Sequence, residues 1–197
     1  MSLAIFDEIN NVKAHLRKVY TDQILQGKVD RKYFEDEIFD LLVLAWLMGS
    51  DDLNAEIGTE AEPDTDAMYD CIFRRIDGKD FRDRVNEHID NDDIEGVLLV
   101  ADTEAMHSYN DGKFVTAREA ANGMEETSDG GGASVSKTWR TMLDDRVRDT
   151  HQYLEGVTVP LDAEFYTYDG DHAPYPTGFE LPENNCNCRC CLSYSRA

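Results

Sequence analysis

The sequence of 197 residues predicts an α+β fold: a mainly helical N-terminal region, then a small mixed α/β module with a short antiparallel sheet. Three observations lead to this fold class. Apolar residues recur at helical spacing from the N-terminus to about residue 121. Three consecutive glycines then occupy 130–132, where neither a helix nor a strand is expected to continue. Beyond them, β-rich runs alternate with turn residues.

Two long amphipathic helices are predicted first. Residues 3–26 carry apolar side chains at helical spacing, and Gly27 ends this helix. Asp30 is placed to cap a second helix, which we expect to stop at Gly49 and Ser50. Because this second helix is apolar over most of its circumference, it should lie in the middle of a bundle.

Three shorter helices are expected next. Residues 51–62 are acidic and weakly apolar, which indicates a short helix that ends at Pro63. Further helices are predicted over 65–76 and over 81–89, where apolar residues again return every three or four positions.

The longest helix is predicted from Ile94 to about Ala121, with Asn91 or Asp92 as its cap. The segment Tyr109–Gly112 is a candidate interruption, because Asn, Asp and Gly favour turns. We expect this helix to pack against both the helices before it and the β-rich segment after it.

The glycine-rich segment 123–132 is predicted to be a mobile loop, and it marks a change in the character of the chain. Strands are expected at 134–142, 157–159 and 165–168. A chain of this length can form one domain or two small ones. We therefore divide it into a helical region, 1–90, and an α+β module, 91–197, that holds the long helix, the loop and the sheet.

The formal net charge of −22 restricts the partners of this protein. Affinity for nucleic acid arises from Lys and Arg that neutralise phosphates, so we expect no tight binding to DNA or RNA. The most apolar run, Ile38–Met48, is about half the length that crosses a bilayer, which argues against a membrane protein. The first twelve residues lack the continuous apolar core of a signal peptide.

Four of the five cysteines crowd into Cys186–Cys191, and Cys71 stands alone. This is not the spacing of a secreted disulfide framework, so we expect the chain to fold in a reducing bacterial cytoplasm.

Side chains capable of chemistry concentrate between Ser136 and Gly156. They are Lys137, Trp139, Asp144, Asp145, Arg146, Arg148 and His151. A strand period of two places Lys137, Trp139 and Thr141 on one face, where Trp139 is expected to anchor the core. The segment is either the acid, base and cation cluster of an enzyme or a clamp of ion pairs.

Two local arrangements are open after Leu143. Helical spacing would bring Asp144, Arg148 and His151 to one side. Alternatively, Asp149 caps a helix that runs to Gly156, and Arg148 reaches back to Asp144 or its neighbour Asp145. In either arrangement the acids and guanidinium groups satisfy each other, so no free catalytic base is expected.

The chain carries none of the common catalytic or nucleotide-binding signatures. A Walker loop, Gly-x-Gly-x-x-Gly, Gly-x-Ser-x-Gly and His-Glu-x-x-His are all absent from the sequence. His151 has no Ser or Cys nucleophile beside it in sequence, and we expect it to be a buried, hydrogen-bonding histidine. We therefore assign no catalytic residue and no cofactor-binding residue, and expect a protein without enzymatic turnover.

The C-terminal cysteines admit two interpretations. On a strand, Cys186, Cys188 and Cys190 would stand in a row about 7 Å apart, too far for one ion unless the chain bends. We therefore expect them to face a core without metal or any other cofactor. The alternative is a structural zinc site formed by Cys186, Cys188 and Cys190 with His151 or His172.

Together these motifs resemble the phage Mu protein F-like family of head morphogenesis, or minor capsid, proteins. The resemblance rests on residues between about Leu98 and Tyr194: Glu104 in Asp102-Thr103-Glu104, Lys137-x-Trp139, Asp144-x-Arg146-Val147-Arg148-x-x-His151-x-x-Leu154-x-Gly156, Phe165, Pro174, Pro176 and Asn187-Cys188-Arg189-Cys190. Where the family commonly has Arg-Thr-Glu, this chain has Asp102, which removes a cation from the expected polar network around Glu104. The chain also has more cysteines in its tail than the family does.

The resemblance implies a structural protein of a tailed phage or prophage. Such a protein would associate with the portal protein, scaffold or major capsid protein, in the host cytoplasm during assembly and inside the virion head afterwards. It would serve procapsid assembly or genome delivery. Two alternatives belong to other classes. One is a toxin-like or ADP-ribosyltransferase-like enzyme with Glu104, Arg148 and His151 in a cleft, and the other is the zinc module.

Overall fold

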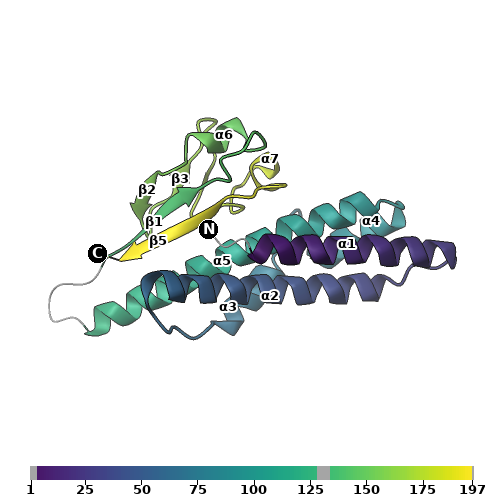
Figure 1. The fold of residues 1–197 in the computed structure, drawn as a ribbon, viewed down its shortest axis with the longest axis horizontal. Coiled ribbons are helices and arrows are strands. Elements are labelled where there is room, and N and C mark those ends of the chain that lie inside the picture. The colour runs from purple at the N-terminus through teal and green to yellow at the C-terminus, as the bar shows by residue number, and fades with distance from the viewer. Residues whose placement is uncertain (1–3, 128–133, 197) are drawn as a thin grey trace.

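The computed structural model describes residues 4–127 and 134–196, apart from the side chains of 125–127. It confirms the predicted α+β class. Long helices form an elongated layer, and a small antiparallel sheet with two single-turn helices lies against one side of it (Figure 1). The longest helix passes beneath the sheet and continues among the other helices, so it contacts both parts.

The helical layer is built from three long helices, two of which pack against the third. Helix α1 (Ala4–Leu25) and α2 (Arg31–Ile57) both pack against α5 (Ile94–Thr127). Asp30 caps α2 as predicted, through a hydrogen bond that the Tyr33 backbone N–H donates to its carboxylate.

The glycines that were expected to end or interrupt helices instead lie where α2 and α5 cross. Both helices are continuous there, so the predicted stop at Gly49 and the predicted break at Tyr109–Gly112 are wrong. A Cβ atom at Gly49 would collide with the Tyr109 carbonyl, and one at Gly112 with the Trp46 carbonyl. These glycines therefore permit close backbone approach, the use of glycine that local sequence patterns do not distinguish from a break.

Because α2 continues to Ile57, the separate helix predicted over 51–62 does not exist. Gly58, in the left-handed conformation with φ of 69°, ends α2 by donating its N–H to the Asn54 carbonyl. Helix α3 (Thr65–Ile72) stops four residues before its predicted end, and α4 (Phe81–Asp90) matches the prediction closely.

Helix α5 begins at Ile94, as predicted, but its cap is not Asn91 or Asp92. Asp93 fills this role, because its carboxylate accepts a hydrogen bond of 2.9 Å from the Gly96 N–H. The helix extends to Thr127, so the first part of the predicted loop at 123–132 is helical. The three glycines lie outside the described residues.

The sheet has the strand order β2-β1-β5 and is antiparallel throughout. Strand β1 (Val135–Arg140) is central and pairs with β2 (Thr158–Pro160) on one side and β5 (Cys191–Arg196) on the other. A second ladder joins β3 (Phe165–Tyr166) to β4 (His172–Ala173). Helices α6 (Asp149–Gln152) and α7 (Pro182–Asn185) are single turns in the connections.

Buried polar contacts tie the sheet to the helical layer. The Lys113 ammonium of α5 donates hydrogen bonds to Glu56 at 2.5 Å and to the Leu192 carbonyl at 2.9 Å. The other Glu56 oxygen accepts the Tyr194 backbone N–H at 2.9 Å. A buried charge is tolerated only when it is paired and hydrogen-bonded, and these contacts satisfy that condition for Lys113.

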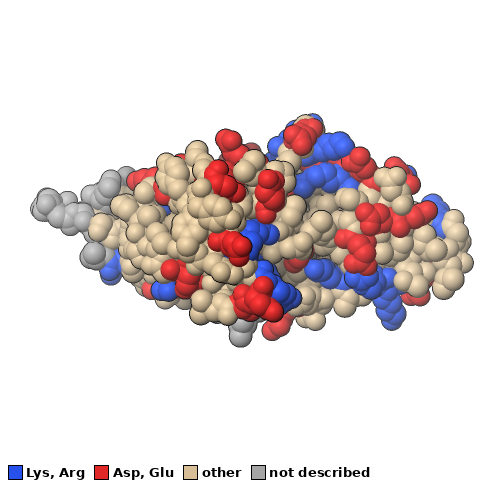
Figure 2. Space-filling view, turned by 90° about the horizontal axis from the view of Figure 1, so that it is seen from above, with Lys and Arg blue, Asp and Glu red and all other residues tan. Residues whose placement is uncertain are grey.

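Acidic and basic side chains are interspersed over the face of the molecule that carries the sheet, without a broad basic patch (Figure 2). Such a surface is a poor match for a polyanion, in keeping with the net charge of −22. Within the described residues, none of the helices combines the length and the apolar character that a membrane span requires.

Candidate functional site

The motif residues on β1 point into the core beneath the sheet. Lys137 and Trp139 are both buried and share one strand face. The Trp139 indole packs edge-on against the rings of His151 and Phe165, with centroid separations of 5.3 and 5.1 Å. Trp139 is thus a core anchor, and it forms one wall around His151.

Asp144 pairs with Arg189 rather than with Arg148. The two Arg189 nitrogens donate hydrogen bonds of 2.8 and 2.7 Å to the two carboxylate oxygens of Asp144. These bonds lower the pKa of Asp144 to about 2. Arg146 lies 3.6 Å from the same carboxylate and is largely exposed. The motif that begins at Asp144 and the last motif of the chain are therefore joined across 45 positions of sequence.

Arg148 binds backbone carbonyls, so both predicted arrangements of this residue are wrong. It donates hydrogen bonds to the carbonyl oxygens of Asn184, at 2.7 Å, and Cys186, at the end of α7. The helix that was predicted to run from Asp149 to Gly156 is only the single turn α6, and no side chain caps it. Carbonyls at a helix end lack partners within the helix, which makes them good acceptors for an arginine.

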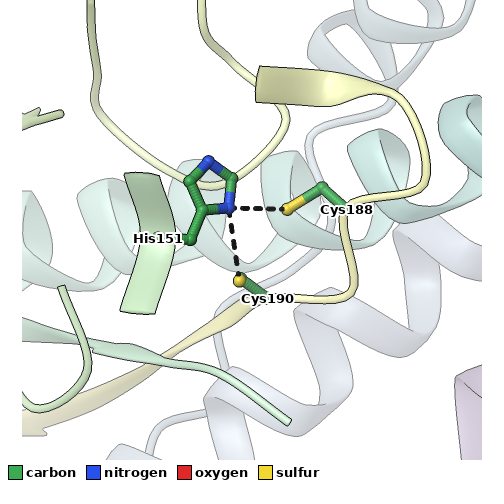
Figure 3. A group of neighbouring side chains, drawn as sticks. All are labelled: His151, Cys188 and Cys190. Carbon is green, nitrogen blue, oxygen red and sulfur yellow. Dashed lines mark hydrogen bonds between the residues drawn. The ribbon is translucent and has the colours of Figure 1, made fainter. Parts of the chain in front are cut away.

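His151 lies at the centre of the site. Its Nδ1 atom is 3.6 Å from the Sγ atoms of both Cys188 and Cys190 (Figure 3). All three side chains are buried, and Phe179 stacks on the imidazole with ring centroids 5.4 Å apart. The Nε2 atom of His151 makes no hydrogen bond within the described part of the chain.

The two thiols have opposite pKa shifts. A hydrogen bond from Cys190 lowers the pKa of Cys188 well below its usual value, and His151 acts in the same direction against the effect of burial. The same hydrogen bond, together with burial, raises the pKa of Cys190. Cys188 is thus the thiol that more readily becomes a thiolate.

The cysteines converge because the chain bends, and the predicted row on a strand is wrong. Cys186 follows the last residue of α7, Asn187 adopts a left-handed conformation with φ of 55°, and β5 starts only at Cys191. Asn tolerates this conformation better than most residues. The bend turns Cys188 and Cys190 to the same side, and Cys186 is not part of their group.

Glu104 forms a second polar centre, away from His151. Arg74 and Arg84 donate three hydrogen bonds to its buried carboxylate, at 3.2, 3.1 and 2.9 Å. Burial alone would raise the pKa of Glu104, but the two arginines and His107 outweigh burial and lower it. The neighbouring Asp102 pairs instead with Lys13 of α1, at 3.2 Å.

Sequence reasoning missed Arg74 and Arg84 because they lie 30 and 20 residues before their partner. The available signal was Glu104 itself, an acid on the apolar side of α5 that needs a buried cation. Asp102 stands where the family commonly has arginine. The cations that pair with Glu104 in this chain are Arg84, in α4, and Arg74, in the segment after α3.

The residues considered for an enzymatic cleft line different cavities. Arg148 and His151 line one of about 10 Å³, room for roughly one water molecule. Glu104 lines another, of about 270 Å³, with Arg74, Arg84 and Phe179. Neither cavity brings the Glu104 carboxylate and the His151 imidazole together.

A comparison with family models decides the classification. The model described as Phage Mu protein F like protein matches residues 65–193, well over half of the chain. The chain belongs to this family. The match begins before the segment on which the resemblance rests and includes Arg74 and Arg84, so the complete Glu104 centre falls inside the Mu F-like region.

Two curated proteins are similar to parts of this Mu F-like chain. A minor head protein of Bacillus phage SPP1 is 29% identical over 96 residues, which cover 49% of this chain and 28% of that protein. An NAD(+)–arginine ADP-ribosyltransferase of Enterococcus faecalis is 29% identical over 128 residues, covering 56% of this chain and 26% of the enzyme. The matched segments span only about a quarter of the length of these relatives. No solved structure matches.

Proposed function

We propose that this protein is a minor capsid, or head morphogenesis, protein of a tailed phage or prophage. Membership of the Mu F-like family and similarity to a minor head protein support this role. The observation that carries it is the pairing of the family motif within the chain itself: Arg189 with Asp144, and Arg148 with backbone carbonyls. Residues that pair within the chain stabilise its fold, and a stable fold is what a protein needs in order to be built into a phage head.

The protein acts by association and not by turnover. The Glu104 carboxylate forms ion pairs with two arginines, and the Asp144 carboxylate forms one with Arg189. His151 borders a cavity that has room for only about one water molecule. A general base needs access to the proton it abstracts. Glu104 lines a larger cavity, of about 270 Å³, but Arg74 and Arg84 already hold its carboxylate.

The similarity to the ADP-ribosyltransferase supports a second candidate, an enzyme that uses NAD(+). The two candidates differ in a direct assay that incubates the full chain with NAD(+), the ADP-ribose donor, and an arginine analogue as acceptor, and measures nicotinamide release. Our proposal predicts no release above background. Turnover above background by the wild-type chain would favour the enzyme. Loss of that turnover in a Glu104→Gln variant that remains folded, with Glu87→Gln still active, would assign it to the Glu104 carboxylate.

The partners under this proposal are the portal protein, the scaffold or the major capsid protein. Assembly takes place in the host cytoplasm, and the protein ends in the interior of the head, where it serves procapsid assembly and genome delivery. With a net charge of −22, it makes these contacts with protein and not with DNA. A gel shift with duplex DNA at physiological salt would contradict this part of the proposal.

The helical layer offers a candidate contact surface. Phe39, Tyr69 and Phe73 form a stack, with centroid separations between 5.8 and 6.4 Å, and Tyr69 is 47% exposed. The Arg82 guanidinium lies 4.6 Å from the centre of the Phe73 ring. Aromatic and Arg side chains are enriched in protein–protein interfaces, so this surface is suited to a head protein.

Co-expression with the portal protein of the same phage, followed by size exclusion, tests the proposal. We expect the two chains to elute together, and Tyr69→Ser to weaken the complex. Tyr168→Ser is the matched control, because Tyr168 is also exposed but lies on the sheet module. The proposal would be overturned if this chain reproducibly elutes separately from each of the portal, scaffold and major capsid proteins. Equal effects of the two variants would show that the surface around Tyr69 is not the contact.

A further inference from the structure

One imidazole nitrogen faces two sulfur atoms at equal distance. His151 Nδ1 lies 3.6 Å from Sγ of Cys188 and 3.6 Å from Sγ of Cys190, and the three atoms lie within 4.8 Å of one another (Figure 3). We propose that these three side chains bind one thiophilic divalent metal ion, with zinc as the expected ion.

The distances fit the coordination geometry of zinc. A zinc ion about 2.0–2.1 Å from nitrogen and about 2.3 Å from sulfur, at a tetrahedral angle, places those two atoms about 3.6 Å apart. Both nitrogen–sulfur separations have this value. The two nitrogen–sulfur separations therefore need little change to accept the ion.

Hydrogen bonding alone accounts less well for this arrangement. A neutral imidazole nitrogen carries either one hydrogen or one lone pair, so Nδ1 can make only one well-aligned bond to the two sulfurs. A metal ion between the three atoms would use one lone pair from each of them. It would thus satisfy Nδ1, Cys188 and Cys190 at once, in a place where burial makes an unsatisfied polar atom unfavourable.

The surroundings favour the charged form of the ligands. Arg146, Arg148 and Arg189 line the small cavity beside the cluster, and cations stabilise thiolates. Two thiolates and a neutral imidazole would balance the charge of a divalent ion. Zinc binds such nitrogen and sulfur ligands, whereas magnesium and calcium prefer oxygen.

The fourth coordination position falls to water. Within the residues that the structure describes, no fourth His, Cys, Asp or Glu belongs to the group. The adjoining cavity of about 10 Å³ has room for roughly one water molecule. A site with three protein ligands and one water is an established zinc arrangement. The inferred ligand set therefore omits Cys186 and His172, which the sequence had offered as further ligands.

Such an ion would link α6 to the segment before β5. It would reinforce the connection that Arg189 and Asp144 make a few residues away. This inference does not depend on the proposed role in the phage head, because metal content and partner binding are measured separately.

Metal analysis of the full chain, purified under reducing conditions without a metal-binding tag, is the first test. We expect about one zinc ion per folded chain. After replacement by Co²⁺, we expect sulfur-to-cobalt charge-transfer absorption and the visible bands of a tetrahedral site. A folded protein that retains no zinc and shows no cobalt–thiolate absorption after reconstitution would overturn the proposal.

Single substitutions then identify the ligands. Cys188→Ser, Cys190→Ser and His151→Asn should each abolish the tetrahedral cobalt spectrum, whereas Cys186→Ser, in the same segment, should preserve it. Retention of the unchanged spectrum in all three ligand variants would contradict the assignment.

A measurement on the unaltered protein covers the case in which ligand variants fail to fold. Thiols of the zinc-loaded chain are alkylated with and without a chelator and located by mass spectrometry. We expect chelation to increase alkylation of Cys188 and Cys190 several-fold and to leave Cys186 unchanged. Equal alkylation with and without chelator, or a disulfide between Cys188 and Cys190 in the reduced preparation, would overturn the metal site.

Discussion

Arg189 donates one hydrogen bond to each carboxylate oxygen of Asp144, and this bidentate pair joins the two most specific motifs of the chain. The planar guanidinium matches the carboxylate in geometry as well as in charge, which lysine cannot do. Asp144 lies in the segment between β1 and α6, and Arg189 lies in the segment before β5, between Cys188 and Cys190.

A double-mutant cycle tests this pair. Asp144→Ala and Arg189→Ala should each lower the free energy of unfolding, and the double variant should lose less than the sum of both. Arg146→Ala is the control. The Arg146 side chain is 74% exposed, and its distance of 3.6 Å from the same carboxylate is longer than the hydrogen bonds of Arg189. Denaturant unfolding measures all five proteins: the wild type, the two single variants, the double variant and the control. Strictly additive losses would show that the pair has no coupling energy.

The pH dependence of the same cycle has a definite sign. The pKa of Asp144 is about 2 in the folded chain, below its ordinary value of 3.8, so the folded state favours the ionised carboxylate. The stability that Asp144 contributes is then complete above pH 4 and is lost as the pH falls from about 4 to 2. The difference between wild type and Asp144→Ala should shrink over that interval and stay constant at neutral pH.

Gly49 and Gly112 should not tolerate alanine, although alanine favours helices by about 1 kcal/mol. The added Cβ would meet a backbone carbonyl of the facing helix, which cannot move aside as a side chain can. Forced overpacking costs about 1–3 kcal/mol, so we expect Gly49→Ala and Gly112→Ala to be destabilising on balance.

Gly123→Ala is the matched control for these two variants. Gly123 is also in α5, but a Cβ there meets no atom of the described residues within 4 Å. It should leave stability unchanged or raise it by about 1 kcal/mol, as measured by thermal unfolding. A stabilising effect of alanine at Gly112 would contradict the close contact between α2 and α5.

Glu104→Gln should destabilise the chain by about 3–5 kcal/mol, because it leaves Arg74 and Arg84 with an uncompensated, partly buried charge. Glu87→Gln removes one partner of the exposed pair with Lys79 and should have little effect. Because the pKa of Glu104 is lowered on folding, its contribution should also disappear as the pH falls below about 4.5. Equal denaturation midpoints for the two variants would refute the buried pairing.

Lys137→Met should stabilise the protein at pH 7, by about 1–3 kcal/mol, because the buried ammonium has no hydrogen-bond partner among the described residues. Its contact with the Phe114 ring, at 4.6 Å, offsets only part of the desolvation. Burial lowers the pKa of Lys137 to about 8, so the penalty in the wild type should diminish between pH 8 and 10.5. A destabilised Lys137→Met variant at pH 7 would instead reveal a favourable role for the charge.

The sequence predicts the structure correctly where the conformation depends on neighbouring residues. The Asp30 cap, the alternation that buries Trp139, and the change from helix to strand all follow from neighbouring residues. The α+β class followed from these patterns, as the structure confirms.

Glycine and arginine positions were misjudged where the reason is distant. Gly49 and Gly112 have the same local pattern as helix breaks, and only the crossing of α2 and α5 distinguishes the two cases. For Arg148 the local pattern predicts an acidic partner nearby, because nothing in the sequence reveals that the end of α7 presents carbonyls to it. The residues around Asn187 likewise do not predict its left-handed conformation, which brings Cys188 and Cys190 together.

The composition of assembled heads tests the central claim, that this chain is a structural component of a phage head. Quantitative mass spectrometry would be applied to purified procapsids and virions of the phage or prophage that encodes it. We expect the protein to be present in procapsids, and deletion of its gene to yield defective or non-infectious heads. Its absence from procapsids and virions, with normal heads after deletion, would contradict the account.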